Sequence, residues 1–344
     1  MTETLLIRTD GSSQIGTGHV MRCLSLAQAW SKADGNVHFV GAKIPNGLTD
    51  RIDQWTTRVH RLNSPRGSQC DATRTTDIAN EYDASWIVVD GPHFDADYLS
   101  ELTVGPARVL LIDDMGKRVH YGTDIVLNQN LHAHEDMYAN RYSDTELLLG
   151  SDYVLFRDEF LEWIDWSPDP EVKPRTLLVT LGGSDPNNHT KTVLNALDQV
   201  EADLETVVIV GALNDSLPEL TDLAEEVNQS IQLKQNVSDM AAQMAWADIA
   251  VSSGGTTCWE LAFMGVPTVV GTIAPIEEYT MTGLRQTKLF SPVGNFEDIA
   301  ESEIGNEITR LISDTDYRTR MSNRGQEIVD GYGRQRTIET MRNF

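Results

Sequence analysis

Residues near the start of the chain combine a flexible backbone with a base. Gly16 and Gly18 lie in a turn directly before His19, and an apolar run at 5–7 precedes that turn. Glycine lets a backbone approach a ligand closely, and histidine exchanges protons near neutral pH. A helix that starts after the turn would also favour an anion. The segment predicts either a phosphate-binding turn with a base beside it or a plain strand-to-helix turn with a solvent-facing His19.

A second glycine turn follows an apolar run at 249–251, and its residues are Ser253, Gly254, Gly255, Thr256 and Thr257. Backbone N–H groups and hydroxyls at the start of a helix suit a diphosphate. Glu260 lies one helical turn further, where its carboxylate can accept both hydroxyls of a ribose. The alternative is a structural one, in which Thr256 caps the helix and Glu260 pairs at the surface. The sequence lacks the Gly-x-x-x-x-Gly-Lys of a P-loop, which argues against a nucleoside triphosphatase.

A third glycine turn, at Gly182, Gly183 and Ser184, follows the apolar run 176–181 and suits close approach of a ligand. A simple turn built on the following Asp185-Pro186 is the alternative.

Polar residues also follow the apolar runs of the first half, at Asp10, Asp90, Asp113, Asp114 and Asn128. We expect the acids to cap helices or bond loops rather than to hold a sugar or a metal. The amide of Asn128 suits sugar hydroxyls or N-acyl groups. A His132-x-His134 pair has no further ligand at a suitable spacing, so we interpret it as a solvated loop, and no metal site is predicted.

The elements that must position these residues alternate between strands and helices. In the first half we expect strands at 5–7, 37–40, 86–89, 109–112 and 125–127, with helices that include 20–30 and 75–80. In the second half we expect strands at 176–181, 207–210, 231–233, 249–251 and 268–270. This alternation predicts α/β domains with parallel, doubly wound sheets, whose ligands bind at the carboxyl ends of the strands.

Three prolines between 166 and 174 indicate a linker. We therefore predict a first domain at 1–165, a linker at 166–174 and a second domain at 175–344, with the last helix able to pack back on the first domain. A cleft between two such domains is a common ligand site.

The composition limits the classes of function. A formal net charge of −25 argues against a nucleic-acid partner. No apolar stretch is long enough to span a membrane, and the first residues lack a basic signal-peptide start, so we expect a cytoplasmic protein. Cys23, Cys70 and Cys258 have unrelated spacings, and we expect neither a disulfide nor a cysteine metal site. Seven lysines against twenty arginines, with many acids, suggest a halophilic source. The oligomeric state is not predicted.

Taken in order, these motifs resemble one family. The pattern Arg-x-Asp-x-x-x-x-Ile-Gly-x-Gly-His-x-x-Arg-Cys at 8–23 is similar to the opening signature of the UDP-2,4-diacetamido-2,4,6-trideoxy-β-L-altropyranose hydrolases of pseudaminic acid biosynthesis. Further matches lie at 89–90, 112–114, 128–130, 153–160, 181–186, 244–248, 254–260 and 265–267. The resemblance implies the two-domain GT-B fold shared with the UDP-GlcNAc transferase of peptidoglycan synthesis, with two Rossmann-like domains that face each other.

The resemblance also implies residue roles. It makes His19 the catalytic residue, with the sugar in the first domain and UDP in the second. No cofactor is implied, and a divalent ion that helps to bind UDP is left open. Residues expected to contact the substrate are Gly16, Gly18, Arg22, Asn128, Gly182, Gly183, Ser184, Asn236, Val237, Ser253, Gly254, Gly255, Thr256, Thr257 and Glu260. The expected reaction is inverting hydrolysis of a UDP-sugar by water that His19 activates.

Two positions depart from the family pattern. Ile276-Glu277 stands where the family usually has Asn-Gln, and Gly91-Pro92-His93 replaces a Tyr that often follows the matching Asp. A glycosyltransferase that activates an acceptor hydroxyl and a non-catalytic nucleotide-sugar-binding protein therefore stay as alternatives. The exact sugar is not predicted.

Overall fold

The structure is a computed structural model that describes residues 3–170, 172–284 and 287–344. It divides into two compact units. The first comprises Met1–Ser12, His19–Asp158 and Tyr332–Phe344, and the second comprises Ser13–Gly18 and Glu159–Gly331. No helix among the described residues is long and apolar enough to cross a membrane.

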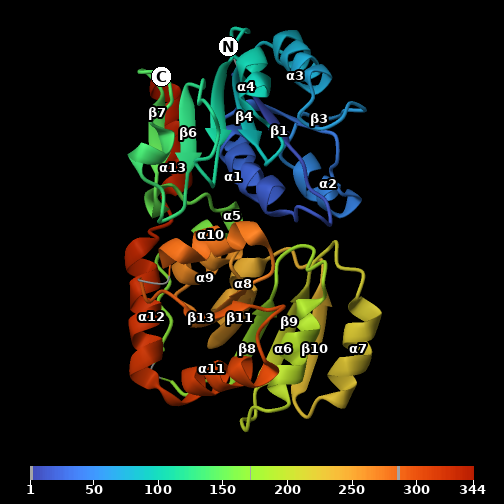
Figure 1. Cartoon of the computed structure of the whole chain (residues 1–344), viewed down its shortest axis with the longest axis vertical. Coiled ribbons are helices and arrows are strands. Elements are labelled where there is room, and N and C mark those ends of the chain that lie inside the picture. Colours follow the sequence, from blue (N-terminus) through green and yellow to red (C-terminus); the bar gives the residue numbers. More distant parts are fainter. Residues whose placement is uncertain (1–2, 171, 285–286) are drawn as a thin grey trace. The chain divides into compact units, whose positions relative to one another are not determined.

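The first unit contains a seven-stranded sheet in the order β3-β2-β1-β4-β5-β6-β7, and every pairing is parallel (Figure 1). Its strands are β1 (Thr4–Thr9), β2 (Asn36–Gly41), β3 (Arg58–Arg61), β4 (Ala84–Asp90), β5 (Arg108–Ile112), β6 (Ile125–Asn128) and β7 (Glu146–Leu149). Because the strands are parallel, their carboxyl ends meet at one edge of the sheet.

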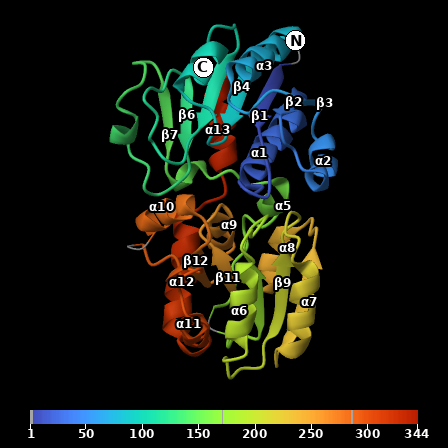
Figure 2. The same ribbon diagram turned by 45° about the vertical axis from the view of Figure 1, so that its right-hand side comes forward.

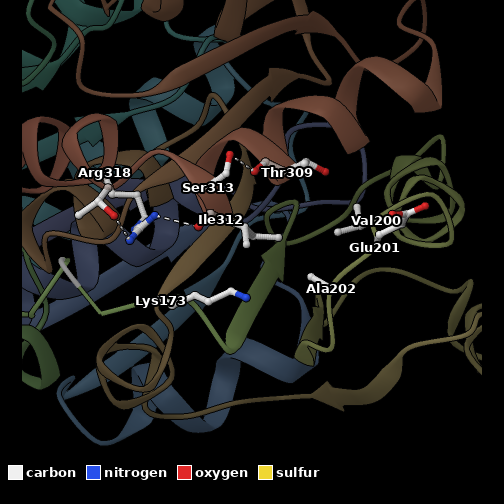
Figure 3. Close-up of a pocket in the computed structure, with 9 residues that line it drawn as sticks. Lys173, Val200, Glu201, Ala202, Thr309, Ile312, Ser313 and Arg318 are labelled. Carbon is white, nitrogen blue, oxygen red and sulfur yellow. Dashed lines mark hydrogen bonds between the residues drawn. The ribbon is translucent and has the colours of Figure 1, made fainter.

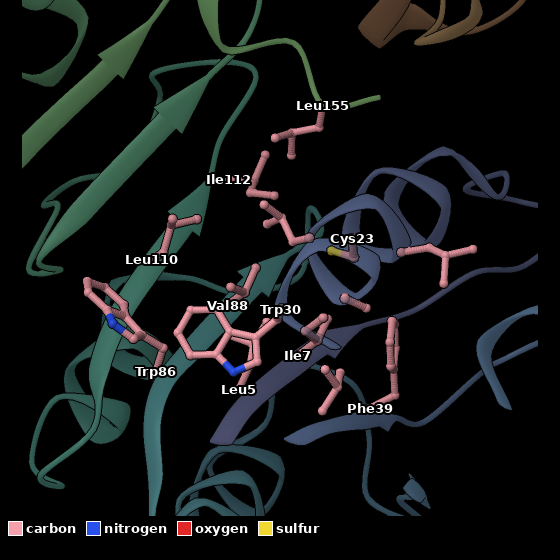
Figure 4. Close-up of a cluster of buried hydrophobic side chains, with 14 of the residues drawn as sticks. Leu5, Ile7, Cys23, Trp30, Phe39, Trp86, Val88, Leu110, Ile112 and Leu155 are labelled. Atoms are coloured by element: carbon pink, nitrogen blue, oxygen red, sulfur yellow. The ribbon is translucent and has the colours of Figure 1, made fainter. Parts of the chain in front are cut away.

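Helices cover both faces of this sheet. They are α1 (Gly18–Lys32), α2 (Asn46–Asp53), α3 (Gln69–Glu81), α4 (Ala96–Leu102) and, at the end of the chain, α13 (Gly333–Asn343), with short 3-10 helices at Glu135–Tyr138 and Ser151–Tyr153. Alternate strand residues such as Leu5 and Phe39 face α1, and Figure 4 shows Cys23 and Trp30 of that helix in the same cluster. The intervening residues, such as Leu6 and Val40, pack against α3 and α4.

The chain returns to the first unit after it has completed the second. Ile338 and Met341 of α13 belong to the same apolar cluster as Leu5. The buried guanidinium of Arg334 donates to Asp158 Oδ1 at 2.9 Å and to the Ser25 carbonyl at 3.3 Å. Figure 2 shows α13, in red, among the green and blue elements of this unit.

The second unit contains a six-stranded parallel sheet in the order β10-β9-β8-β11-β12-β13. Its strands are β8 (Thr176–Thr180), β9 (Glu205–Val210), β10 (Ser230–Gln235), β11 (Ile249–Ser253), β12 (Thr268–Thr272) and β13 (Ser291–Asn295). Its helices are α5 (Asp158–Leu161, of which Asp158 clusters with the first unit), α6 (His189–Leu197), α7 (Leu217–Glu226), α8 (Met240–Trp246), α9 (Thr257–Phe263), α10 (Pro275–Leu284), α11 (Glu301–Ser313) and α12 (Thr315–Ile328). Residues of α6, α7, α11 and α12 pack with the strands in one apolar cluster.

The predicted α/β class with two parallel sheets is confirmed, and each predicted strand lies on an observed one. The strands β3, β7 and β13 are not among the predicted ones. All three lie at sheet edges, where a strand needs no long apolar run because it has only one neighbour. The segment Arg58–Arg61 is mostly polar, and Ser291–Asn295 contains a proline and a glycine.

The boundary between the units falls between Asp158 and Glu159, earlier than the predicted linker. The described part of 166–174 contains no helix or strand and clusters with the second unit. Arg318, which is 1 % exposed, donates to the carbonyls of Pro170 and Val172. These bonds tie the proline-rich segment to α12.

Candidate functional site

The carboxyl edge of the first sheet gathers ionisable side chains. Asp90 ends β4, Asp114 follows β5 in the chain, and β4 and β5 are neighbours in the sheet. Helix α1 begins at Gly18 and brings His19 and Arg22, one turn apart, to the same edge. These four side chains form one hydrogen-bonded network.

His19 is bound through one ring nitrogen. Its Nδ1 lies 2.8 Å from Asp90 Oδ1, and 22 % of its side chain is exposed. Within the described residues, the hydrogen bonds of this ring all involve Nδ1. A proton on Nδ1 that is donated to the carboxylate leaves Nε2 as the basic nitrogen. The pair has the geometry of a base that a carboxylate orients.

Arg22 holds the two acids of the network. Its guanidinium donates to both oxygens of Asp90 at 2.6 and 2.7 Å and to both oxygens of Asp114 at 2.8 Å. Burial would raise the pKa of Asp90, but Arg22 and then His19 hold that pKa far below its ordinary value. Burial likewise opposes the charge of Arg22, but Asp114 and Asp90 hold its pKa well above the ordinary value. Asp90 is thus ionised beside His19.

Arg22 is only 4 % exposed. Its described contacts are with Asp90, Asp114 and His19 Nδ1, the last at 3.2 Å, and a contact with substrate stays a prediction. These contacts hold in place the carboxylate of Asp90 that His19 also contacts.

Asn128 has internal partners as well. It is fully buried, its amide nitrogen donates to the Tyr138 hydroxyl at 2.8 Å, and its carbonyl oxygen accepts from the Asn130 backbone and side chain. Asn130 in turn donates to Asp114 Oδ1 at 2.9 Å. Asn130 thus links Asn128 to Asp114 of the network. A direct contact of Asn128 with a sugar stays a prediction.

Two strand-end acids bond loops, as the sequence reading favoured. Asp10 accepts from the backbone N–H groups of Ala42 and Lys43 and from buried Arg8. Asp113 accepts from the Gly116 N–H and pairs with Arg118. Asp90 and Asp114 differ from these two because they converge on Arg22 beside His19, and no sequence spacing indicates that difference.

The glycine turns of the second unit lie side by side. β8 and β11 are neighbours with Thr180 opposite Ser252, so the turns that follow them leave the same edge of the sheet. A Cβ on Gly182 would lie 3.8 Å from the Ser253 hydroxyl oxygen. The structure therefore brings together the predicted residues Gly182, Gly183, Ser184, Ser253, Gly254 and Gly255.

Gly183 and the neighbouring Gly211 leave no room for a side chain, and Gly18 is closely packed. A Cβ on Gly183 would lie 2.2 Å from Thr17 Oγ1, and one on Gly211 would lie 2.4 Å from the backbone of Gly183. A Cβ on Gly18 would lie 3.2 Å from Thr256 Oγ1. The segment Ser13–Gly18, which directly precedes His19, thus packs against both glycine turns within the second unit. Thr17 is not among the residues predicted from the sequence.

The remaining predicted residues lie near the same edge. Gly16 has a φ of +73°, which explains a glycine there. Thr256 and Thr257 open α9 and are half-buried, as is Glu260 in the first turn of that helix. Asn236, exposed and with a φ of +57°, and half-buried Val237 follow the end of β10.

A pocket of about 490 Å³ lies elsewhere in the second unit (Figure 3). Its lining includes Lys173, which precedes β8, and Glu201, which precedes β9, so it lies at the amino ends of the strands. Arg318 beside it donates to the carbonyls of Leu311 and Ile312 and supports the fold. This pocket is therefore separate from the glycine turns.

Potential metal ligands do not cluster in the described part of the chain, where no group of three or more His, Cys, Asp or Glu side chains could hold an ion. His132 Nε2 lies 3.0 Å from the Asp114 carbonyl oxygen, and His134 is mostly exposed. Cys23, Cys70 and Cys258 are free thiols.

Comparison with known proteins bears on both units. Residues 176–274, which include both glycine turns, match the glycosyltransferase family 28 C-terminal domain. The solved structure of S. aureus MnaA with UDP covers 100% of this chain and 96% of its own, with 10% identity and a TM-score of 0.69. This chain has the GT-B fold. The predicted GT-B fold with two parallel sheets is thereby confirmed.

Curated proteins are also similar to this chain in sequence. An uncharacterized protein of Methanocaldococcus jannaschii is 26% identical over 77% of this chain, and the match spans 55% of that protein's length, about half. The UDP-2,4-diacetamido-2,4,6-trideoxy-β-L-altropyranose hydrolase of Campylobacter jejuni is 28% identical over 64% of this chain and 72% of its own. The resemblance to the hydrolase family that the motifs indicated is thereby confirmed.

Proposed function

We propose that this GT-B protein hydrolyses a UDP-linked 2,4-diacetamido-2,4,6-trideoxyhexose to UDP and the free sugar, as a step in the formation of a nonulosonic acid such as pseudaminic acid. The observation that carries the proposal is the hydrogen bond between His19 Nδ1 and Asp90, which leaves Nε2 able to accept a proton. The named activity of the Campylobacter jejuni relative supports the choice of substrate.

In this proposal the second unit binds the nucleotide. Backbone N–H groups of the turns at 182–184 and 253–257 bond the diphosphate oxygens, and Glu260 accepts the ribose hydroxyls. The backbone near Asn236 and Val237 meets the uracil. Gly16 and Gly18 leave space for the sugar and the attacking water. The turns at 182–184 and 253–257 leave the same edge of the second sheet, which supports the proposal that both bind the diphosphate.

The proposed reaction is a single displacement. Water attacks the anomeric carbon on the side opposite to UDP, and its proton passes to His19 Nε2. The bond between the anomeric carbon and the phosphate oxygen breaks, and UDP leaves with the electron pair while N–H groups stabilise its charge. Ionised Asp90 stabilises the imidazolium that forms. The anomeric configuration is inverted.

Turnover in water tests the proposal. Wild-type protein and His19→Asn are incubated with the UDP-sugar alone, while UDP release and the sugar anomer are followed by NMR. We expect wild-type release of the inverted sugar, and at least about a 10³-fold slower release by His19→Asn with unchanged UDP binding. Near-normal turnover of His19→Asn would remove His19 from the mechanism.

A glycosyltransferase is the second candidate, because residues 176–274 match a glycosyltransferase domain. In that case His19 would deprotonate an acceptor hydroxyl instead of water. UDP release that requires an added acceptor would favour the transferase. Tight UDP-sugar binding without turnover under either condition would favour a nucleotide-sugar-binding protein.

A further inference from the structure

Glu277, on helix α10, is a buried acid at the second glycine turn. It is 8 % exposed, and its Oε2 accepts from the Ile273 backbone N–H at 2.8 Å. A Cβ on Gly255 would lie 3.3 Å from Glu277 Oε1, and one on Gly254 would lie 3.2 Å from Glu277 Cβ. The carboxyl group therefore lies directly against the turn that the proposed function assigns to the diphosphate.

The surroundings of Glu277 act on its charge in opposite directions. Burial raises the pKa of Glu277 to about 7, against the lowering effect of hydrogen bonds from the Ile273 N–H, the Ser253 hydroxyl, and the Gly254 and Ala274 N–H groups. Two of these donors, Ser253 and Gly254, belong to the glycine turn. When ionised, Glu277 is thus an anion of the chain itself at an anion-binding turn.

Among the residues that the structure describes, the titratable neighbours on α9 and α10 do not neutralise this charge. Cys258 on α9 has a pKa raised well above its ordinary value by burial and then by Glu277 and Glu260, so this thiol stays protonated. Glu260 lies on α9 as well, and exposed Glu278 follows Glu277 on α10. These neighbours contribute negative charge or none.

We propose that Glu277 couples diphosphate binding to the uptake of a proton, so that the nucleotide site accepts its ligand with Glu277 in the neutral form. This inference rests on the proposed function, because it uses the same site. A diphosphate and an ionised carboxylate compete for the N–H groups of one turn and repel each other at close range. A neutral carboxyl group removes the repulsion, and its O–H can donate to a phosphate oxygen.

The coupling predicts a defined dependence of affinity on pH. At a pH below the pKa of Glu277 the acid is already neutral, so the dissociation constant does not change with pH. Above that pKa each bound ligand takes up one proton, and the dissociation constant rises about tenfold per pH unit. Glutamine at this position imitates the neutral acid and should abolish the dependence.

The test is calorimetric titration with UDP-N-acetylglucosamine between about pH 5.5 and about pH 9. UDP itself is unsuitable, because its terminal phosphate has a second pKa of about 6 and would titrate within this pH range. In UDP-N-acetylglucosamine the sugar is attached to that phosphate. His19→Asn protein serves as the parent, so that His19 neither turns over the probe nor contributes protons. Glu277→Gln and Glu278→Gln are compared in that background, and Glu278 is the exposed neighbour on the same helix.

We expect the parent and Glu278→Gln to bind about tenfold more weakly per pH unit above about pH 7, and Glu277→Gln to bind equally well throughout. The same slope in Glu277→Gln as in the parent would overturn the inference. Binding by no protein at any pH would instead refute the proposed nucleotide site. A second measurement does not depend on the Glu277 variant. Titrations of the parent at about pH 8 in two buffers of different ionisation enthalpy give the number of protons taken up per bound ligand. About one proton per ligand is expected, and none would contradict the inference.

Discussion

His19 Nδ1 lies 2.8 Å from Asp90 Oδ1, and the same carboxylate accepts two hydrogen bonds from Arg22. One buried acid thus orients the proposed base and is itself held in place by a guanidinium. Since Asp90 ends β4 and His19 begins α1, the relationship depends on the packing of this helix against the carboxyl edge of the sheet.

Replacing Asp90 with Asn should remove the orientation of His19 while the side chain keeps its size. We expect kcat for UDP release to fall by about 10³ to 10⁴, with a KM close to wild type, because the wrong imidazole tautomer is favoured. Steady-state kinetics measure this effect. Asp113→Asn is the matched control, since Asp113 bonds Gly116 and Arg118 instead. Equal losses of kcat in the two folded variants would contradict the role of Asp90.

Replacing Arg22 with Met should destabilise the fold. The change leaves buried Asp90 and half-buried Asp114 without their shared cation. Loss of one partner from a buried ion pair costs about 3–5 kcal/mol in the free energy of unfolding. Arg22→Lys should recover only part of this, because one ammonium cannot bond both carboxylates as the guanidinium does. Urea unfolding at neutral pH measures both variants. A cost below about 1 kcal/mol for Arg22→Met would show that the network adds little to stability.

Replacing Glu277 with Gln should change how stability depends on pH without any ligand. The pKa of Glu277 is raised from an ordinary 4.5 to about 7, so the folded protein binds this proton more tightly than the unfolded chain does. The stability that the bound proton provides is fully present below the pKa of the unfolded chain and is lost as the pH rises through about 7. Glu277→Gln should therefore gain roughly 2–3 kcal/mol over wild type between about pH 4.5 and about pH 8. Urea unfolding at both pH values tests this, with Glu278→Gln as control. An equal difference at both pH values would mean that Glu277 does not titrate in this range.

Replacing Gly211 with Ala should disturb nucleotide binding indirectly. The added Cβ would lie 2.4 Å from the Gly183 backbone, which must then move. We expect at least about tenfold weaker UDP binding, because the turn loses its close approach to the ligand. Gly105→Ala is the control, since its Cβ would meet no atom closer than 3.7 Å. Unchanged UDP affinity in folded Gly211→Ala would argue against the turn at 182–184 as part of the site.

The interior strands could be predicted from sequence because apolar runs such as 109–112 need burial on both faces. The edge strands β3 and β13 could not, because Arg58–Arg61 and Ser291–Asn295 lack that pattern, whereas the edge strand β10 was predicted at 231–233. The glycine turn at 182–184 could also be located, since close packing at Gly183 requires this residue type. Gly211, which packs against it, was not singled out.

The partners of the site residues were harder to predict. Asp90 and Asp10 both follow strands, yet one meets His19 and the other bonds a loop, and only the fold distinguishes them. Glu277 is distant in sequence from Gly255, and its burial against that turn depends on the packing of α10. Long-range contacts of this kind leave no local pattern in the sequence.

The return of α13 to the first unit has a consequence for synthesis on the ribosome. The first unit's core includes Ile338 and Met341, and Arg334 bonds Asp158 within it, yet these residues are translated after the whole second unit. Domains generally fold in the order in which they are made. Here the unit that begins the chain is the one that can be completed last, so a nascent chain that stops before Tyr332 carries a finished second unit and an open first one.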